Sequence, residues 1–95
     1  MIYNNVILKA REATDIAELQ SLLIAQAETS LTEQGCARFE VYHSEAEPEV
    51  FLLIEWWNTQ ADLDAHRNAP HFVEVYRPKV IPLVERFPHP SQRLI

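Results

Sequence analysis

The chain has 95 residues, 47% of them hydrophobic and 23% charged, the composition of one ordinary globular domain, here expected to span residues 1–95. Its formal net charge is −6 and its eight Lys and Arg residues are scattered, so neither a nucleic-acid-binding stripe nor a membrane-surface helix is expected. With no apolar run long enough to span a bilayer, no signal-peptide pattern and a single cysteine, the sequence predicts a reduced, cytoplasmic location.

The first third of the chain is predicted to form a strand and then a helix. Residues 2–9 are rich in Ile, Val and Leu, as strands are. Thr14 and Asp15 are typical of a helix start, with a hydroxyl cap and a negative charge near the helix N-terminus. Gly35 follows the expected end of this helix, at about residue 33, where a left-handed cap needs a glycine. Apolar residues recur on one face of the helix: Ile16, Leu19, Leu23 and Ala27.

The middle of the chain predicts a β-hairpin. Residues 36–43 alternate between apolar and polar side chains, and the polar loop 44–49 leads into a second strand over residues 50–57. Two strands joined by so short a loop should pair antiparallel. Because residues 50–54 are apolar on both faces of the strand, both faces of the sheet should be covered. The helices can cover one face, so we expect a homodimer that packs through the other.

A second helix is expected after the hairpin. Thr59 and Asp62 have the spacing of a capping box, in which a side chain at the helix start satisfies free backbone N–H groups. Leu63 and His66 are three residues apart and therefore share a face of this helix.

The end of the chain is rich in proline. Pro70 suits the first position of a new helix over residues 71–84, which Pro78 and Pro82 should kink or divide. Residues 91–95 are predicted to form a short edge strand. The resulting order β-α-β-β-α-β predicts an α+β, ferredoxin-like split βαβ fold with a four-stranded antiparallel sheet.

One segment resembles a known family. Residues 55–66, EWWNTQADLDAH, resemble the E-x-W…A-L-x-x-H segment of antibiotic-biosynthesis-monooxygenase domains, and residues 69–72, APHF, continue the match. Upstream, residues 33–36, EQGC, followed by residues 39–42, FEVY, resemble the family's turn into its second strand.

The resemblance implies a dimeric α+β barrel with one small-molecule pocket in each protomer, between sheet and helices. The best-known members of the family oxidise quinols or anthrone-type polyketides with O2 and use no metal or flavin. Other branches degrade haem or isomerise a phosphorylated diketone from autoinducer-2 breakdown. Haem-degrading members place a ligating histidine where this chain has Tyr76, so haem is not expected. The resemblance to the quinol- and anthrone-oxidising members implies that no other cofactor is needed.

An oxygenase without cofactor needs a base to form the substrate anion and hydrogen-bond donors to stabilise it. Trp57 with His66 or His71 is the expected catalytic set, because histidine titrates near neutral pH and the indole N–H is a donor. Each also has a structural interpretation: Trp57 as core filling, His66 on the helix surface and His71 at a helix start. The expected substrate-binding residues are Glu55, Tyr42, Tyr76 and Phe72, and for Glu55 we favour binding to a backbone N–H or an arginine over catalysis.

A metal site is not expected. His66 and His71 are five residues apart with a proline between them, unlike the four-residue spacing of two zinc ligands on one helix face. Cys36 has no companion thiol, and its spacing from His43 does not favour a nucleophilic pair.

The sequence therefore predicts a cofactor-independent monooxygenase acting on a quinol-like or enolisable small molecule. Two alternatives stay open. One is an isomerase of the autoinducer-2-degradation type, which would use the same histidines on a small carbonyl compound. The other is a non-catalytic dimeric module that binds a ligand without turning it over.

Overall fold

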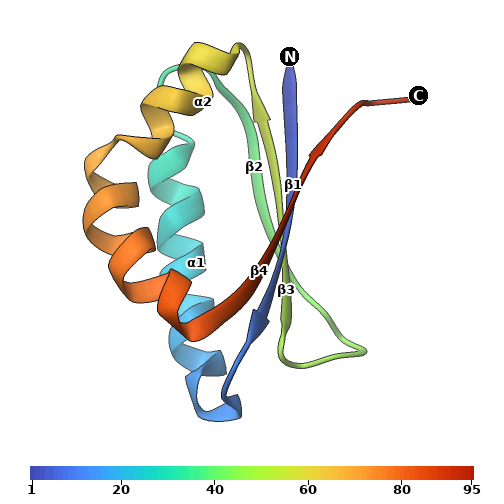
Figure 1. The fold of residues 1–95 in the computed structure, drawn as a ribbon, viewed down its shortest axis with the longest axis vertical. Helices are drawn as coiled ribbons and strands as arrows, with labels where there is room; N and C mark the ends of the chain where they lie inside the picture. Colours follow the sequence, from blue (N-terminus) through green and yellow to red (C-terminus); the bar gives the residue numbers. More distant parts are fainter.

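The computed structural model describes all 95 residues. Four strands form one antiparallel sheet in the order β2-β3-β1-β4, and the helices cover one of its faces (Figure 1). This architecture confirms the predicted α+β ferredoxin-like fold. No helix combines the length and apolar character needed to cross a membrane. In chain order the elements are β1 (Ile2–Ala10), the 3-10 turn η1 (Ala13–Asp15), α1 (Ile16–Ser30), β2 (Cys36–His43), β3 (Val50–Trp57), α2 (Gln60–Arg67), the π-helix η2 (Phe72–Val80), the 3-10 turn η3 (Ile81–Leu83) and β4 (Val84–Ser91).

The core lies between the sheet and the helix layer. Alternation along β3 turns Phe51, Leu53, Glu55 and Trp57 toward the helices, where all four are buried. The neighbouring strand β1 adds Val6 and Leu8 to the same face of the sheet, and α1 contributes Leu19 and Leu23 from the helix layer. Full burial of each such aliphatic side chain stabilises the fold by about 1.5–3 kcal/mol.

The start and end of α1 differ from the prediction. A 3-10 turn precedes the helix and leaves Asp15, rather than Thr14, at the N-cap, without a side-chain cap hydrogen bond. The helix ends at Ser30, and the chain then turns tightly into β2. Gly35 does adopt a left-handed φ of 79°, but it lies in this turn rather than at the helix cap. A Cβ there would collide with the Asp62 side chain, so the turn packs closely against α2.

The capping box of α2 is confirmed: the Thr59 hydroxyl oxygen accepts the Asp62 N–H at 3.1 Å. This fixed start places Leu63 and His66 on the buried face of the helix, as their spacing predicts.

The helical segment predicted over residues 71–84 is divided, as its prolines predict, into a π-helix and a 3-10 turn. The prediction for the last strand was wrong: it is β4, not residues 91–95. Pro82 lies in the 3-10 turn, after which the chain pairs with β1. Because β4 is an edge strand, alternate N–H groups need no partner strand and Pro88 and Pro90 are tolerated.

Candidate functional site

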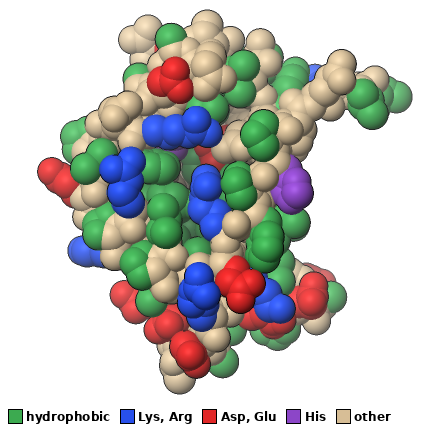
Figure 2. All heavy atoms as spheres, in the orientation of Figure 1, with side chains coloured by type: hydrophobic (Ala, Val, Ile, Leu, Met, Phe, Trp, Pro, Cys, Tyr) green, Lys and Arg blue, Asp and Glu red, His purple; other side chains and the backbone are tan.

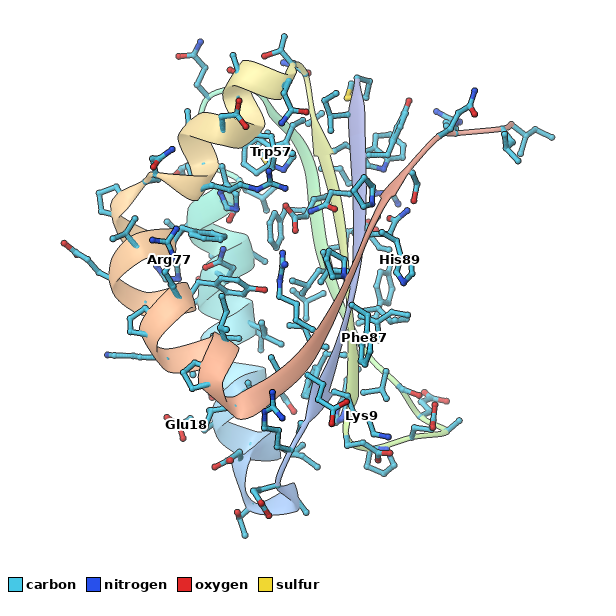
Figure 3. The ribbon with its side chains drawn as sticks, viewed as in Figure 1. Lys9, Glu18, Trp57, Arg77, Phe87 and His89 are labelled. Carbon is cyan, nitrogen blue, oxygen red and sulfur yellow. The ribbon has the colours of Figure 1, made fainter.

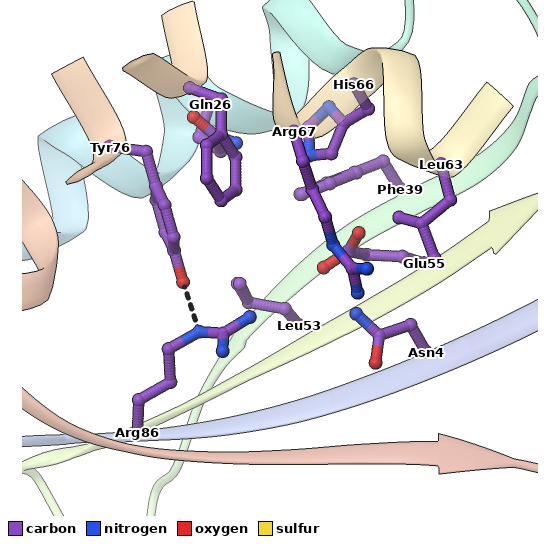
Figure 4. Close-up of a pocket in the computed structure, with 11 residues that line it drawn as sticks. Asn4, Gln26, Phe39, Leu53, Glu55, Leu63, His66, Arg67, Tyr76 and Arg86 are labelled. Carbon is purple, nitrogen blue, oxygen red and sulfur yellow. Dashed lines mark hydrogen bonds between the residues drawn. The ribbon is translucent and has the colours of Figure 1, made fainter. Parts of the chain in front are cut away.

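A small polar cavity lies between the sheet and the helices. Its volume is about 10 Å³, room for the centre of about one water molecule. Figure 2 shows a recess on this side, between the helices and β4, with Lys and Arg side chains on its rim. Five elements supply the polar side chains that line the cavity: Asn4 from β1, Gln26 from α1, Glu55 from β3, His66 and Arg67 from α2, and Arg86 from β4 (Figure 4).

Glu55 is a carboxylate inside the core. Its residue is only 5% exposed, and its Oε1 accepts the indole N–H of Trp57 at 3.1 Å. Burial raises the pKa of Glu55, and the Trp57 hydrogen bond with the charges of His66, Arg86 and Arg67 offsets only part of that rise. The site therefore holds a carboxyl group that binds a proton more tightly than an exposed glutamate does.

His66 is held by a second carboxylate. Its Nδ1 lies 2.5 Å from Glu33 Oε1, a contact short enough for a charge-assisted hydrogen bond. The imidazole is buried and packs against the rings of Trp57, at 4.5 Å between centroids, and Phe72, at 5.3 Å. Glu33 does not line the cavity. Because an ionised carboxylate only accepts hydrogen bonds, Nδ1 donates to Glu33 and Nε2 is the nitrogen free to act as a base.

Tyr76 and Arg86 form a further pair on the β4 side of the cavity. Arg86 Nε donates to the Tyr76 hydroxyl at 3.1 Å, the dashed line in Figure 4. Tyr76 is buried, and burial raises the pKa of its phenol, so the hydroxyl keeps its proton. Since the oxygen already accepts from Arg86, that proton is available for donation to another group.

Two buried amides complete the site. Asn4 and Gln26 are 3% and 2% exposed, and the carbonyl oxygens of both side chains lack hydrogen-bond partners. The sequence carries a signal for each of them. Gln26 lies three residues after Leu23, on the apolar face of α1, and Asn4 alternates with the buried Val6 of β1. A polar residue in a buried apolar series needs a partner or a purpose.

The structure brings together most of the sequence-predicted site residues. Glu55, His66, Phe72 and Tyr76 all line the cavity. Trp57 lies just behind them, between the sheet and the helix layer (Figure 3), and its only side-chain hydrogen-bond donor, the indole N–H, donates to Glu55.

Two predicted residues do not join this group. Tyr42 lies on the opposite face of the sheet, 49% exposed and hydrogen-bonded to Glu40, because strand alternation turns it away from the helices. His71 precedes η2 and does not line the cavity. Its Nε2 is buried without a partner elsewhere in the helix layer.

Cys36 is not placed for nucleophilic chemistry. Burial and the nearby carboxylates of Glu55 and Glu33 raise the pKa of its thiol to about 11, so the reactive thiolate is scarce. His43 is at the far end of β2. No three His, Cys, Asp or Glu side chains are grouped to hold a metal ion.

Fold and site together define a ferredoxin-like α+β domain that encloses a buried polar centre between sheet and helices. The profile of the family described as antibiotic biosynthesis monooxygenase matches residues 1–77, and the chain belongs to this family.

Two curated relatives match part of the chain. Over 68 residues it is 34% identical to Rv0793 of Mycobacterium tuberculosis, provisionally named a monooxygenase, covering 72% of this chain and 65% of that protein. Over 74 residues it is 31% identical to the uncharacterized protein sll1783 of Synechocystis sp., covering 78% of this chain and 48% of that protein. The match thus spans about half the length of sll1783 and under two thirds of Rv0793.

Solved structures share the fold. That of Rv0793 superposes with a TM-score of 0.87 at 23% identity, covering 100% of this chain and 97% of the other. SnoaB, a cofactor-independent oxygenase from Streptomyces nogalater, superposes with a TM-score of 0.85 at 13% identity, covering 99% and 93%. At these identities the likeness shows the fold alone.

The raised pKa of Glu55 predicts a pH-dependent stability. A carboxyl group whose folded-state pKa is raised costs no stability below its ordinary pKa of 4.5. The cost grows as the pH rises from that value to the folded-state pKa, and it is complete above the folded-state pKa. Glu55→Gln should therefore unfold at a higher temperature than the wild type at neutral pH, with the difference vanishing below about pH 4. Thermal denaturation across this pH range, with the exposed Glu18→Gln as control, measures it. A variant less stable than the wild type at pH 7 would contradict the account.

Proposed function

We propose that the protein is a cofactor-independent monooxygenase that oxidises a quinol-like or enolisable small molecule with O2. The observation that carries this proposal is the pairing of His66 with Glu33 on one side, while the imidazole lines a polar cavity on the other. Family membership and the monooxygenase name of the 34% identical Rv0793 support the reaction class. We place the reaction in the cytoplasm, where the single free Cys36 would stay reduced.

In the proposed reaction His66 Nε2 accepts a proton from an acidic C–H or O–H group of the substrate. The resulting anion gives one electron to O2, and the two radicals combine into a peroxide anion. This anion takes the proton back from His66 and becomes a hydroperoxide. Loss of water from the hydroperoxide leaves a new carbonyl group. One oxygen atom enters the product, the other leaves as water, and both reducing electrons come from the substrate. The Tyr76 hydroxyl and Arg86 donate hydrogen bonds to the oxyanion as it forms.

Substrate entry requires side chains to move, because the cavity is filled to within about 10 Å³. Phe72 is the candidate for the side chain that moves. It lines the cavity, is only partly buried, and is the first residue of the π-helix η2. Turns of π-helix are frequent at functional sites. We propose that the Phe72 ring leaves its place between His66 and Tyr76 when substrate binds.

We further propose that a second copy of the chain covers the open face of the sheet. The helices lie on the other face, and Phe87 and His89 point away from them (Figure 3). The open face is rich in large apolar side chains, including Ile7, Leu52, Ile54 and Phe87. An exposed apolar patch rimmed by polar residues is typical of a protein–protein interface.

Oxygen uptake by metal-stripped protein tests the proposed reaction. With a panel of anthrones and naphthohydroquinones, we expect consumption that survives chelator and falls at least about 100-fold in His66→Gln, the usual contribution of a general base. Glu33→Gln should lower the rate less, and the exposed Glu18→Gln should leave it unchanged. Uptake that persists in His66→Gln would contradict the proposal. Turnover without oxygen would instead support an isomerase, and binding without turnover a ligand-binding module.

Light scattering during gel filtration tests the dimer. We expect a mass of twice the 11.0 kDa of one chain, and the monomer mass for Leu52→Lys, which would bury an unpaired charge at the interface. The control is Leu31→Lys, because Leu31 is exposed at the end of α1, on the helix layer. A monomeric wild type, or dimers of both variants, would contradict this proposal.

A further inference from the structure

We infer that the cavity binds an anion: a molecule with one ionised oxygen that pairs with Arg67 and Arg86, and a second oxygen substituent that hydrogen-bonds to Asn4 and Gln26. This inference rests on the proposed function, since it assigns the substrate class of the same site. It adds that the substrate carries its charge on binding, before any proton is removed by His66.

The charges around the cavity are unequal. The charged side chains that line it are Glu55, His66, Arg67 and Arg86, so one carboxylate faces two guanidiniums. Glu33 is the formal partner of His66 and lies outside the lining. β1 and α1 contribute only neutral amides. Glu55 and the two arginines together carry a net charge of +1 when Glu55 is ionised and +2 when Glu55 is protonated.

The two arginines also have unused donors. Arg86 donates a hydrogen bond from its Nε to the Tyr76 hydroxyl, and its terminal nitrogens donate to no protein acceptor. Arg67 reaches from α2 toward Glu55 and Asn4 (Figure 4) and forms neither a salt bridge nor a side-chain hydrogen bond. The exposed Arg38, in contrast, pairs with Glu40 at 2.9 Å. Guanidinium groups suit planar oxyanions, to which they can donate two parallel hydrogen bonds.

The amides supply the second half of the recognition. Asn4 Oδ1 and Gln26 Oε1 are buried acceptors without donors, and both side chains line the same cavity as the arginines. Buried polar atoms in folded proteins are nearly always satisfied, so an unpaired pair around one cavity indicates a ligand group that satisfies them. A hydroxyl group can donate to such an oxygen and also accept from an amide N–H.

Calorimetric titration at neutral pH tests this inference with three probes. They are 2-hydroxy-1,4-naphthoquinone, whose enol is ionised, its neutral 2-methoxy analogue, and 1-hydroxy-2-naphthoate, a carboxylate. We expect at least one of the two charged probes to bind at least about tenfold more tightly than the neutral one. The two anions together distinguish an enolate site from a carboxylate site, because only the geometry that fits will bind tightly.

The variants assign the effect to residues. Arg67→Met and Arg86→Met should each abolish the preference for the anion, whereas Arg11→Met, at an exposed position outside the cavity, should keep it. Arg67 makes no hydrogen bond that the fold needs, so its variant remains informative if Arg86→Met loosens Tyr76. Equal affinities for charged and neutral probes, no binding of any probe, or a preference that survives both substitutions would overturn the inference.

This test is separate from that of the proposed function. The binding of all three probes can be measured whether or not the protein converts them to product. Tight anion binding without oxygen uptake would leave the inference intact and reject the oxygenase. Oxidation of neutral quinols without any preference for anions would do the reverse.

Discussion

The carboxylate of Glu55 inside the core is the constraint on which the rest of the site depends. Alternation along β3 forces this position to face the helices, between Leu53 and Trp57. A charged group there is costly unless donors and opposite charges surround it. The neighbouring elements supply them: the indole N–H of Trp57 from the same strand, His66 and Arg67 from α2, and Arg86 from β4.

Two carboxylates thus take different roles according to their surroundings. Glu33 belongs to the turn before Gly35, keeps 18% of its side chain exposed, and orients the imidazole of His66. Glu55 is enclosed, and burial raises its pKa. Environments that separate the behaviour of two like groups are how active sites assign acid and base roles at one pH. His66 is hydrogen-bonded to the first of these carboxylates, and its charge lowers the pKa of the second.

The sequence could predict the parts of the site that local patterns determine. The capping box at Thr59 and the spacing of Leu63 and His66 gave a helix with a buried histidine, and β3 was predicted with its observed bounds. The family segment over residues 55–72 pointed to the same region.

Other features depend on contacts between distant segments. Glu33 and His66 are 33 residues apart in the sequence, and no local pattern predicts their contact. Arg86 was not predicted as a site residue because Pro88 and Pro90 give its segment a poor strand propensity. The pairing of β4 with β1 outweighs that propensity. Whether an oxygen of Asn4 is left unpaired can be read only from its surroundings in the folded chain.

The tautomer of His66 tests the central claim most directly. Nitrogen-15 NMR of the imidazole, recorded above the pH range in which histidines titrate, distinguishes a protonated ring nitrogen from one with a free lone pair. The account predicts a proton on Nδ1, donated to Glu33, and a free lone pair on Nε2. In Glu33→Gln the proportion of this tautomer should fall. A proton fixed on Nε2 in the wild type would contradict the account, because His66 could then not act as the base toward a substrate in the cavity.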